Sequence, residues 1–418
     1  MLFPYGTLPF YKPDMMSRPP QESALGVAEA ETLIRRTLRP LGTERVALGA
    51  AAGRILRETI AAERDQPPYD RVMMDGIALR HGAPARLPIL GTQRAGMPAL
   101  NLTDPSGCIE TMTGAMCPAG ADTIVPVERI TRVDGVATLE PGYTPVPGQF
   151  IHRRGSDCRA GEALLSPGTR LSAPALAVLA GNGVAEVAVS RRPRLAILST
   201  GDELVPVDGP VRDWEIRRSN EEAIAASLAL HGFGEAERFW APDDPDATMA
   251  VMTRALAERD VVILSGGVSM GDFDYVPQAL EQLGVRRIFH RVAQRPGRPL
   301  WFGLGPQGQA VFALPGNPVS AMTCFTRYVL PALTAAEGAT ESRAVPLALA
   351  EDAPRLPDLT RFMPARLTHA ASGQTLAHLL PVSTSGDFNH LGSTDGIVEI
   401  PPGDGAAPAG SAVTFHGW

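Results

Sequence analysis

Two glycine-containing segments carry residues suited to binding an anion. Residues 265–271 read Ser-Gly-Gly-Val-Ser-Met-Gly, and residues 314–320 read Leu-Pro-Gly-Asn-Pro-Val-Ser. Because glycine has no Cβ, its backbone N–H can approach a ligand closely, and a serine hydroxyl adds a further donor. Tight turns and helix caps are the alternative explanations. The candidate binding residues in the two segments are Gly266, Gly267, Ser269, Gly271, Pro315, Asn317, Pro318 and Ser320.

Three arginines lie close together between these two segments. Arg291, Arg295 and Arg298 fall within eight residues around a Pro-Gly pair, and Pro299 follows directly. A guanidinium contributes about 1.5 to 3 kcal/mol through a charge-assisted hydrogen bond to phosphate or another oxyanion. The cluster therefore predicts an oxyanion site, with a solvated basic loop as the alternative.

Carboxylates occur in loop contexts rich in Gly or Pro. Carboxylates near phosphate-binding groups commonly hold Mg²⁺, which takes a few protein oxygens together with phosphate. Capping and turn formation are the simpler explanation for any single one of them. The candidates for a Mg²⁺ site are Asp75, Glu203, Asp243, Asp272 and Asp274.

Alternating strand and helix patterns begin near Arg194 and must position these groups. We predict strands over 195–199 and 261–265, and helices over 220–231, 248–258 and 318–333. This alternation is typical of a parallel sheet covered by helices on both faces, which binds ligands at the carboxyl ends of its strands. Both glycine-containing segments follow predicted strands, so they should meet at that edge.

The rest of the chain predicts smaller parts around this domain. Helical patterns cover 24–38, 47–56 and 173–181, whereas strand-like runs occur at 109–113, 123–127, 396–400 and 412–415. The fold class expected is a multidomain α/β protein with a doubly wound central domain. The predicted domains are a discontinuous helical lobe (21–60 and 151–190), an inserted β domain (61–150), the doubly wound catalytic domain (191–338) and a C-terminal β domain (339–418).

Composition narrows the class of protein. The chain has 418 residues and a formal net charge of −7, which argues against general nucleic-acid binding. Its four cysteines form no CxxC pair, which fits a reducing compartment and gives no zinc-ligand spacing. No apolar run long enough for a membrane helix or a signal peptide occurs, so we expect a cytoplasmic protein without membrane partners.

Six motifs in chain order resemble one known family. They are Pro67-Pro68-Tyr69-Asp70 with Met74-Asp75-Gly76, Met112-Thr113-Gly114-Ala115, Ser199-Thr200-Gly201-Asp202-Glu203-Leu204, Gly266-Gly267-Val268-Ser269 with Asp274-Tyr275, Arg295-Pro296-Gly297-Arg298-Pro299, and Pro315-Gly316-Asn317-Pro318-Val319-Ser320. In combination they resemble the molybdopterin molybdenumtransferases, the family of the gephyrin E domain and its plant relative. The resemblance covers almost the whole chain from about Leu25.

The resemblance implies an activity and an assembly. Members of this family use adenylylated molybdopterin and molybdate, release AMP with the help of Mg²⁺, and leave molybdenum on the dithiolene. It also implies a four-domain homodimer whose subunits share sites, and partners among the other proteins of molybdenum cofactor biosynthesis.

The resemblance also implies roles for single residues. Active-site polar positions match Asp75, Thr113, Asp157, Glu203, Asp243 and Asp274, and we expect Asp274, Asp243 and Glu203 to hold Mg²⁺. The molybdate pocket matches Arg295, Arg298 and Ser320, with Ser385 and Arg361 from the C-terminal domain. Arg291 and Arg366 are expected to add positive charge for phosphate or pterin.

Some positions depart from the family pattern. Arg295 and Arg298 replace the usual lysines, Arg218 replaces an acidic or amide residue, Val72 replaces a serine, and Pro364 replaces an aromatic residue. A tungstate-preferring paralogue and a scaffolding paralogue without turnover therefore remain alternatives. A molybdopterin adenylyltransferase or a nucleotide amidohydrolase would share the doubly wound domain, but neither explains the motifs at Asp75 and Thr113.

Overall fold

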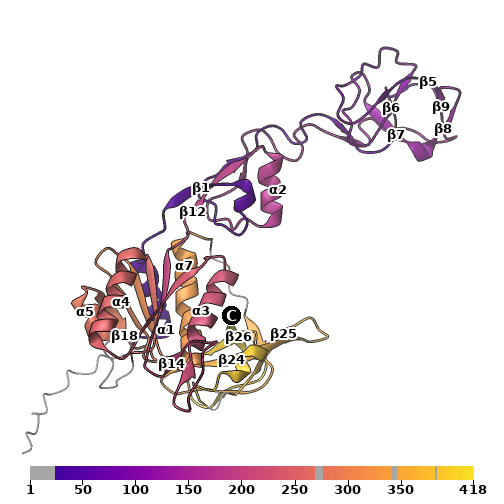
Figure 1. Ribbon diagram of the computed structural model, residues 1–418. Helices are drawn as coiled ribbons and strands as arrows, with labels where there is room; N and C mark the ends of the chain where they lie inside the picture. The colour runs from indigo at the N-terminus through magenta and orange to yellow at the C-terminus, as the bar shows by residue number, and fades with distance from the viewer. Residues whose placement is uncertain (1–23, 269–275, 341–345, 382–383) are drawn as a thin grey trace, which may run out of the picture. The chain divides into compact units, whose positions relative to one another are not determined.

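The chain folds into two units, each with its own hydrophobic cores. The computed structural model describes residues 24–268, 276–340, 346–381 and 384–418 (Figure 1). The first unit contains the chain up to Leu41, Arg191–Glu337 and the chain from Glu341 onward. The second contains Gly42–Ser190 and Gly338–Thr340.

A six-stranded sheet forms the centre of the first unit. Its strand order is β16 (Ala236–Ala241), β13 (Leu195–Thr200), β17 (Val261–Ser265), β21 (Ala310–Leu314), β20 (Trp301–Leu304) and β18 (Arg286–His290). The first four strands are parallel, and β20 and β18 add an antiparallel edge. Because β16 and β17 flank β13 on opposite sides, the chain reverses its direction of winding at β13, which confirms the doubly wound prediction.

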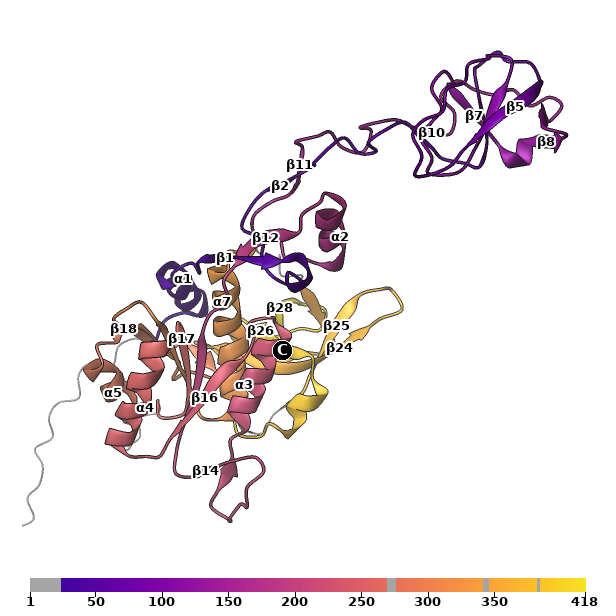
Figure 2. The ribbon, with the colours of Figure 1, turned by 45° about the horizontal axis from the view of Figure 1, so that its top comes forward.

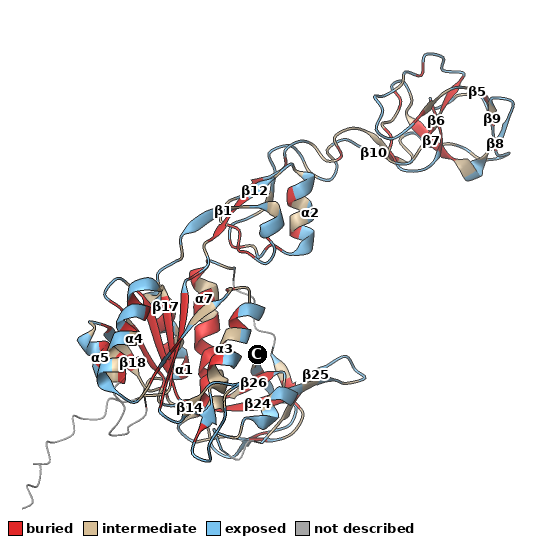
Figure 3. Ribbon diagram, in the orientation of Figure 1, coloured by how far each residue is buried: buried red, intermediate tan, exposed pale blue. Residues whose placement is uncertain are grey.

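Helices cover both faces of this sheet. Leu195 and Ile197 of β13 pack into one core with helices α1 (Val27–Thr37), α3 (Ser219–Leu230), α6 (Pro318–Cys324) and α7 (Leu330–Ala336). Ala196 and Leu198 face the opposite core, beneath α4 (Pro245–Glu258) and α5 (Val276–Gln282). Figure 2 shows α4 and α5 side by side, and Figure 3 shows the buried strands between the helix layers. A strand buried on both faces must be apolar throughout, which explains the continuous apolar runs.

The helix predicted over 318–333 is interrupted. A five-residue π-helical segment, Phe325–Val329, separates α6 from α7. Pro331 lies in the first turn of α7 and lacks the N–H that would bond to the carbonyl of Arg327. The wider π turn accommodates this missing hydrogen bond without ending the helix.

The C-terminal part closes into a small β-barrel. Its strands β24 (Thr360–His369), β25 (Thr375–Leu379), β22 (Leu347–Leu349), β28 (Ala412–Gly417) and β26 (Gly396–Ile400) follow one another, and β26 pairs back with β24. Apolar side chains including Val398 and Ala377 fill its interior. Strand β19 (Gln294–Arg295) of the central domain adds in parallel to β24. The barrel is thereby hydrogen-bonded to the segment that carries the arginine cluster.

The second unit begins with a two-stranded ribbon. Strands β1 (Thr43–Ala47) and β12 (Glu186–Ser190) pair antiparallel and pack with helix α2 (Ala173–Gly181), which has the predicted bounds. The helix predicted over 47–56 is wrong, because only a 3-10 turn at Leu48–Ala50 forms there. Ala51 and Leu56 are instead buried in this core through an irregular segment that pairs with the chain near Arg170.

Helix α1 does not belong to the helical lobe that was predicted to contain it. Val27, Ala30 and Ile34 of α1 are buried against the central sheet, and Leu25 pairs with Val292. Residues 24–41 therefore pack with the central domain, unlike the lobe predicted over 21–60. The apolar stripe on α1 identifies a buried face, but it carries no information about which core will receive it.

The inserted β segment forms a third core. Its six-stranded sheet has the order β7 (Thr123–Pro126), β4 (Gly76–Leu79), β6 (Cys108–Thr111), β5 (Arg86–Gln93), β9 (Val136–Leu139) and β8 (Ile130–Val133). Short pairs connect it to the ribbon end of the unit, β2 (Ile60–Ala61) with β11 (Ala163–Leu165) and β3 (Arg71–Val72) with β10 (Ile151–His152). In the described part of the chain, no helix is long and apolar enough to cross a bilayer.

Candidate functional site

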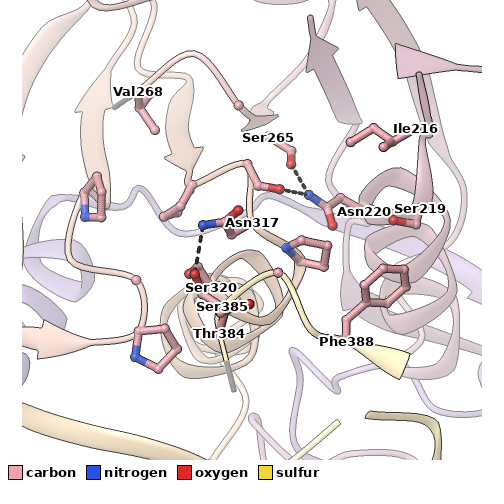
Figure 4. Close-up of a pocket in the computed structure, with 18 of the residues that line it drawn as sticks. Ile216, Ser219, Asn220, Ser265, Val268, Asn317, Ser320, Thr384, Ser385 and Phe388 are labelled. Carbon is pink, nitrogen blue, oxygen red and sulfur yellow. Dashed lines mark hydrogen bonds between the residues drawn. The ribbon is translucent and has the colours of Figure 1, made fainter. Parts of the chain in front are cut away.

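A cavity of about 1510 Å³ opens at the carboxyl ends of β13, β17 and β21. It lies where the winding direction of the sheet reverses, the place where open α/β sheets bind ligands. The barrel contributes its far wall through residues such as Arg361, Ser385 and Phe388. Figure 4 shows side chains from the central domain and the barrel facing the same space. The predicted edge of the sheet is therefore a composite pocket.

The glycine loop after β17 lines this cavity in a conformation that requires glycine. Gly266 and Gly267 have φ values of 100° and 69°. A Cβ on Gly267 would lie 2.4 Å from Val276 Cγ2, and a Cβ on Gly316 would lie 3.5 Å from the Gly266 Cα. The two glycine loops thus lie against each other and expose backbone to the cavity. Ser269 and Gly271, also predicted here, fall outside the described residues.

Asn220 holds these two loops together. Its Nδ2 donates to the Ser265 Oγ and to the Gly316 carbonyl, each at 2.8 Å (Figure 4). Asn220 lies in the first turn of α3, where an asparagine usually indicates a cap, so its sequence context does not predict a role in the site.

The second loop and the first turn of α6 bind the barrel. Asn317 Nδ2 donates to the Ser385 Oγ at 2.8 Å, and the Val319 N–H donates to the Ser385 carbonyl at 3.1 Å. Ser320 lies in the same helical turn and lines the cavity, as do Pro315 and Pro318. The structure thus brings the predicted binding residues of the second loop into direct contact with the predicted Ser385.

Two arginines face the cavity side by side. Arg295 of β19 is in register with Arg361 of β24, and both line the cavity with Arg298 and Pro299. Burial, together with the charge of Arg295, lowers the pKa of Arg361. Among the described residues, none forms an ion pair with these two guanidinium groups. Adjacent like charges repel, so an anion between them would relieve that repulsion.

Carboxylates also line the cavity. Glu203 lies in the loop after β13 with its carboxylate against Gly201, and Asp243 lies after β16. The Asp243 N–H donates to Asp202 Oδ1 at 3.1 Å, which joins the two loops. Within the described ranges, no three His, Cys, Asp or Glu side chains gather as a metal site. Asp272 and Asp274 lie outside the described residues.

Two further groups in the cavity were not selected from the sequence. The Thr200 Oγ1 is buried at the end of β13, and among the described residues it has no hydrogen-bond partner. Arg218, noted as a departure from the family pattern, lines the cavity 3.7 Å from a carboxylate oxygen of Glu221. Glu221 in turn accepts a hydrogen bond from Ser199 at 3.1 Å. Arg218 is thus partly neutralised by its own helix.

Arg291 and Arg366 do not line this cavity. The Arg291 N–H donates to the Leu300 carbonyl, and its own carbonyl accepts from Leu25. Arg366 is exposed on β24, opposite His378 of β25. Alternation along β24 separates the two predicted arginines, because Arg361 and Arg366 are five residues apart and so face opposite sides of the strand.

The remaining predicted residues lie in the second unit. Asp75 Oδ1 accepts from the N–H and the Oγ1 of Thr113, at 2.6 and 2.7 Å. The hydrogen bond from the Thr113 hydroxyl lowers the pKa of Asp75 most, and the bond from the Thr113 N–H lowers it further. His152 Nε2 lies 2.7 Å from Asp157 Oδ1, and His152 Nδ1 lies 2.9 Å from Arg71. Asp75 and Asp157 are therefore both fixed, exposed carboxylates.

Comparison with known families accounts for the whole architecture. Residues 25–183 match the MoeA N-terminal region (domain I and II), residues 196–335 match a probable molybdopterin binding domain, and residues 346–418 match the MoeA C-terminal region (domain IV). The doubly wound domain and its cavity thus define a protein of the molybdopterin-binding class.

Individual relatives narrow this class further. The chain is 36% identical over 399 residues to the molybdopterin molybdenumtransferase of Synechocystis sp., covering 94% of this chain and 100% of that protein. It is 38% identical over 342 residues to the enzyme of the same name from Synechococcus elongatus, covering 79% and 84%. A crystal structure of the molybdopterin biosynthesis moeA protein of Pyrococcus horikoshii OT3 matches with a TM-score of 0.79 at 27% identity, covering 95% and 100%. The chain belongs to the molybdopterin molybdenumtransferase family.

Proposed function

We propose that this chain inserts molybdenum from molybdate into adenylylated molybdopterin and releases AMP. The in-register pair Arg295 and Arg361 carries the proposal, because two adjacent guanidinium groups, without an ion-pair partner among the described residues, suit a doubly charged oxyanion. The two glycine loops, whose backbone lines the cavity, suit the phosphate of the adenylate. The cavity is large enough to hold both substrates.

The chemistry requires charge neutralisation more than a strong nucleophile. Cleavage of the anhydride develops negative charge on the phosphoryl oxygens, and fixed donors aimed at those oxygens stabilise it. Molybdate oxygen or water can attack the phosphorus, so no side chain has to form a covalent intermediate. Arg295, Arg298 and Ser320 would orient the oxyanion, whereas the loop at Gly266 would hold the phosphate.

Mg²⁺ fits the carboxylate side of the cavity. Mg²⁺ usually keeps several waters and binds one or two carboxylates together with substrate phosphate, so it does not need a cluster of three acidic side chains. Glu203 and Asp243 supply two carboxylates in one cavity, and we propose that they hold the ion together with Asp274. The ion would neutralise phosphoryl oxygens.

We further propose a cytoplasmic homodimer in which Asp75, Thr113 and Asp157 of one subunit complete the site of the other. These residues are exposed polar groups of the second unit, and hydrogen bonds fix their side chains. Both the N–H and the hydroxyl of Thr113 donate to Asp75, and Asp157 contacts His152. Exposed groups that are fixed in this way could act on a substrate held by a partner subunit. The proteins of molybdenum cofactor biosynthesis would supply the substrate and receive the product.

One experiment tests the activity directly. The purified protein is incubated with adenylylated molybdopterin and with molybdate, tungstate or neither, each with and without Mg²⁺, and AMP is measured. We expect release that depends on the oxyanion and on Mg²⁺. Stronger release with tungstate would assign the tungstate-preferring alternative, and no release from folded protein would assign the scaffolding one.

A further inference from the structure

A buried polar network lies behind the arginine loop. Gln294 is fully buried, and it lies next to Arg295 in the wall of the cavity. Its Oε1 accepts a hydrogen bond from the Tyr328 hydroxyl. Its Nε2 donates to the Pro296 carbonyl at 3.0 Å and lies 3.5 Å from the Cys324 Sγ. One amide therefore connects the loop to the α6–α7 helix.

The loop is held at both residues that separate its arginines. Gln294 binds the Pro296 carbonyl, and the Cys324 thiol donates to the Gly297 carbonyl at 3.5 Å. Gly297 has a φ of 91°, and a Cβ there would lie 2.5 Å from the Cys324 Sγ. The backbone between Arg295 and Arg298 thus rests directly on these core side chains.

The same helix carries the oxyanion-pocket serine. Ser320 and Cys324 are four residues apart in α6, so they lie on one face of the helix. Ser320 lines the cavity, while Cys324 contacts the back of the arginine loop. The bonds to Gln294 and Cys324 therefore set the distance between the arginines and Ser320.

The network keeps its protonation state throughout the neutral range. Burial raises the pKa of Tyr328 and that of Cys324, so the phenol and the thiol both remain protonated donors. Arg327, next to Tyr328, is also buried and forms ion pairs with Glu31 at 2.8 Å and with Glu399 at 2.8 Å. A buried network whose members are all hydrogen-bonded favours a single geometry.

We infer that Gln294, Tyr328 and Cys324 are positioning residues that set the affinity of the pocket for its oxyanion. Of the three, Gln294 lines the cavity, but its amide is engaged with Tyr328 and with the Pro296 carbonyl. Through these bonds the three residues fix the loop whose arginines face the oxyanion. The inference rests on the proposed function. The helix that carries Cys324 and Tyr328 would then contribute to oxyanion recognition as well as to the hydrophobic core.

Tyr328→Phe is the most direct test, because it removes one hydroxyl and keeps the ring. The matched control is Tyr143→Phe, which removes the same group from a hydrogen bond to Gln149 in the inserted β domain. We expect Tyr328→Phe to raise the molybdate KM about three- to tenfold, the value of one neutral hydrogen bond, with kcat at saturating molybdate nearly unchanged. Tyr143→Phe should change neither constant.

A second pair of variants is needed in case the loop keeps its position without the Tyr328 hydroxyl. Gln294→Met removes all bonds of the amide, and its control is Gln309→Met, a buried glutamine that donates to the Leu256 carbonyl at 2.7 Å near the opposite ends of the strands. Both variants should lose some thermal stability. Only Gln294→Met should weaken molybdate binding, and Gln294→Glu, which keeps an acceptor for Tyr328, should recover part of it.

Direct binding of molybdate to the protein, measured by calorimetry, separates the two proposals. If the wild-type protein neither binds molybdate nor releases AMP, the proposed function fails. If the wild-type protein does both while Tyr328→Phe and Gln294→Met, folded, bind molybdate as tightly as it does, the positioning role is overturned. A fall in kcat with unchanged molybdate affinity would also overturn it.

Discussion

Two positive charges held in register across β19 and β24 dominate the cavity. Arg295 and Arg361 come from different domains, and burial with the neighbouring charge lowers the pKa of Arg361. The two like charges repel each other, and an anion between them would relieve that repulsion. A site with two adjacent positive charges favours the binding of anions over neutral or cationic ligands.

Arg361→Ala should therefore weaken molybdate binding strongly. The loss of one charge-assisted bond, about 1.5 to 3 kcal/mol, corresponds to about a 10- to 150-fold higher dissociation constant. Calorimetric titration with molybdate measures this change. The control is Arg238→Ala, an exposed arginine of β16 that pairs with Glu222. Equal affinities of the two variants would remove Arg361 from the oxyanion pocket.

Adjacent aspartates at the start of α4 allow a matched test of the metal proposal. Asp243 lines the cavity, whereas Asp244 caps α4 by accepting from the Ala247 N–H at 2.8 Å. We expect Asp243→Asn to raise the Mg²⁺ concentration that gives half-maximal AMP release. Asp244→Asn should leave it unchanged, because asparagine caps a helix about as well as aspartate. An identical Mg²⁺ titration for Asp243→Asn and wild type would contradict the assignment.

The charged residues of the cavity can be predicted from the sequence better than the residues that hold their loops in place. Arg295 and Arg298 flank a Pro-Gly pair, and Glu203 follows a predicted strand and a glycine, so these sequence contexts predict a ligand site. Asn220 and Gln294 belong to a helix start and a short strand, where the same side chains serve capping or packing. Their roles depend on which loops come together in space, and that information lies in contacts between distant segments.

At the scale of elements, the patterns that could be predicted are those set by one segment alone. Helix α2 and strands β17 and β26 have the predicted bounds, because local periodicity and flanking residues determine them. The 3-10 turn at Leu48–Ala50 and the core chosen by α1 depend on packing partners instead. Tertiary contacts override weak local preferences in such places.

An ion-pair group at the opposite ends of the strands gives a pH dependence. Asp260, just before β17, accepts bonds from Arg191 at 2.8 Å and from the Arg194 N–H at 2.7 Å. Burial would raise its pKa, but these bonds outweigh burial and lower the pKa to about 2, from an ordinary 3.8. The carboxylate therefore stabilises the fold above about pH 4, and this stabilisation disappears as the pH falls toward 2.

Asp260→Asn should lower the melting temperature at neutral pH. The loss is at most about 2 kcal/mol, because the two arginines are partly exposed and water screens them. Thermal melts from pH 7 downward should show the wild-type advantage shrinking below about pH 4. Asp208→Asn, at an exposed position, is the control. A wild-type advantage that grew toward low pH would contradict the expected sign.

At the scale of the whole molecule, the proposed shared sites predict complementation. Asp75→Asn and Arg295→Ala alter different units of the chain and should each be inactive alone. In a mixed dimer, one of the two sites would contain both intact contributions, which gives about half of the wild-type AMP release. Random reassortment makes about half of the dimers mixed, so about a quarter of the wild-type release should return in the mixture. Asp75→Asn mixed with Thr113→Val should recover nothing, because both changes affect the same contribution. No recovery in verified mixed dimers would place all the residues of a site in one chain.

The insertion of Gly42–Ser190 between α1 and the central sheet also governs how the protein is made. Helix α1 leaves the ribosome first, yet the strands that bury Val27, Ala30 and Ile34 begin only at Leu195. At about 5 to 20 residues per second, roughly 10 to 30 seconds of synthesis separate them. During that interval the apolar stripe of α1 has no native partner, while the second unit can already fold. The apolar stripe of α1 is therefore exposed on the nascent chain until the strands of the central sheet have been made.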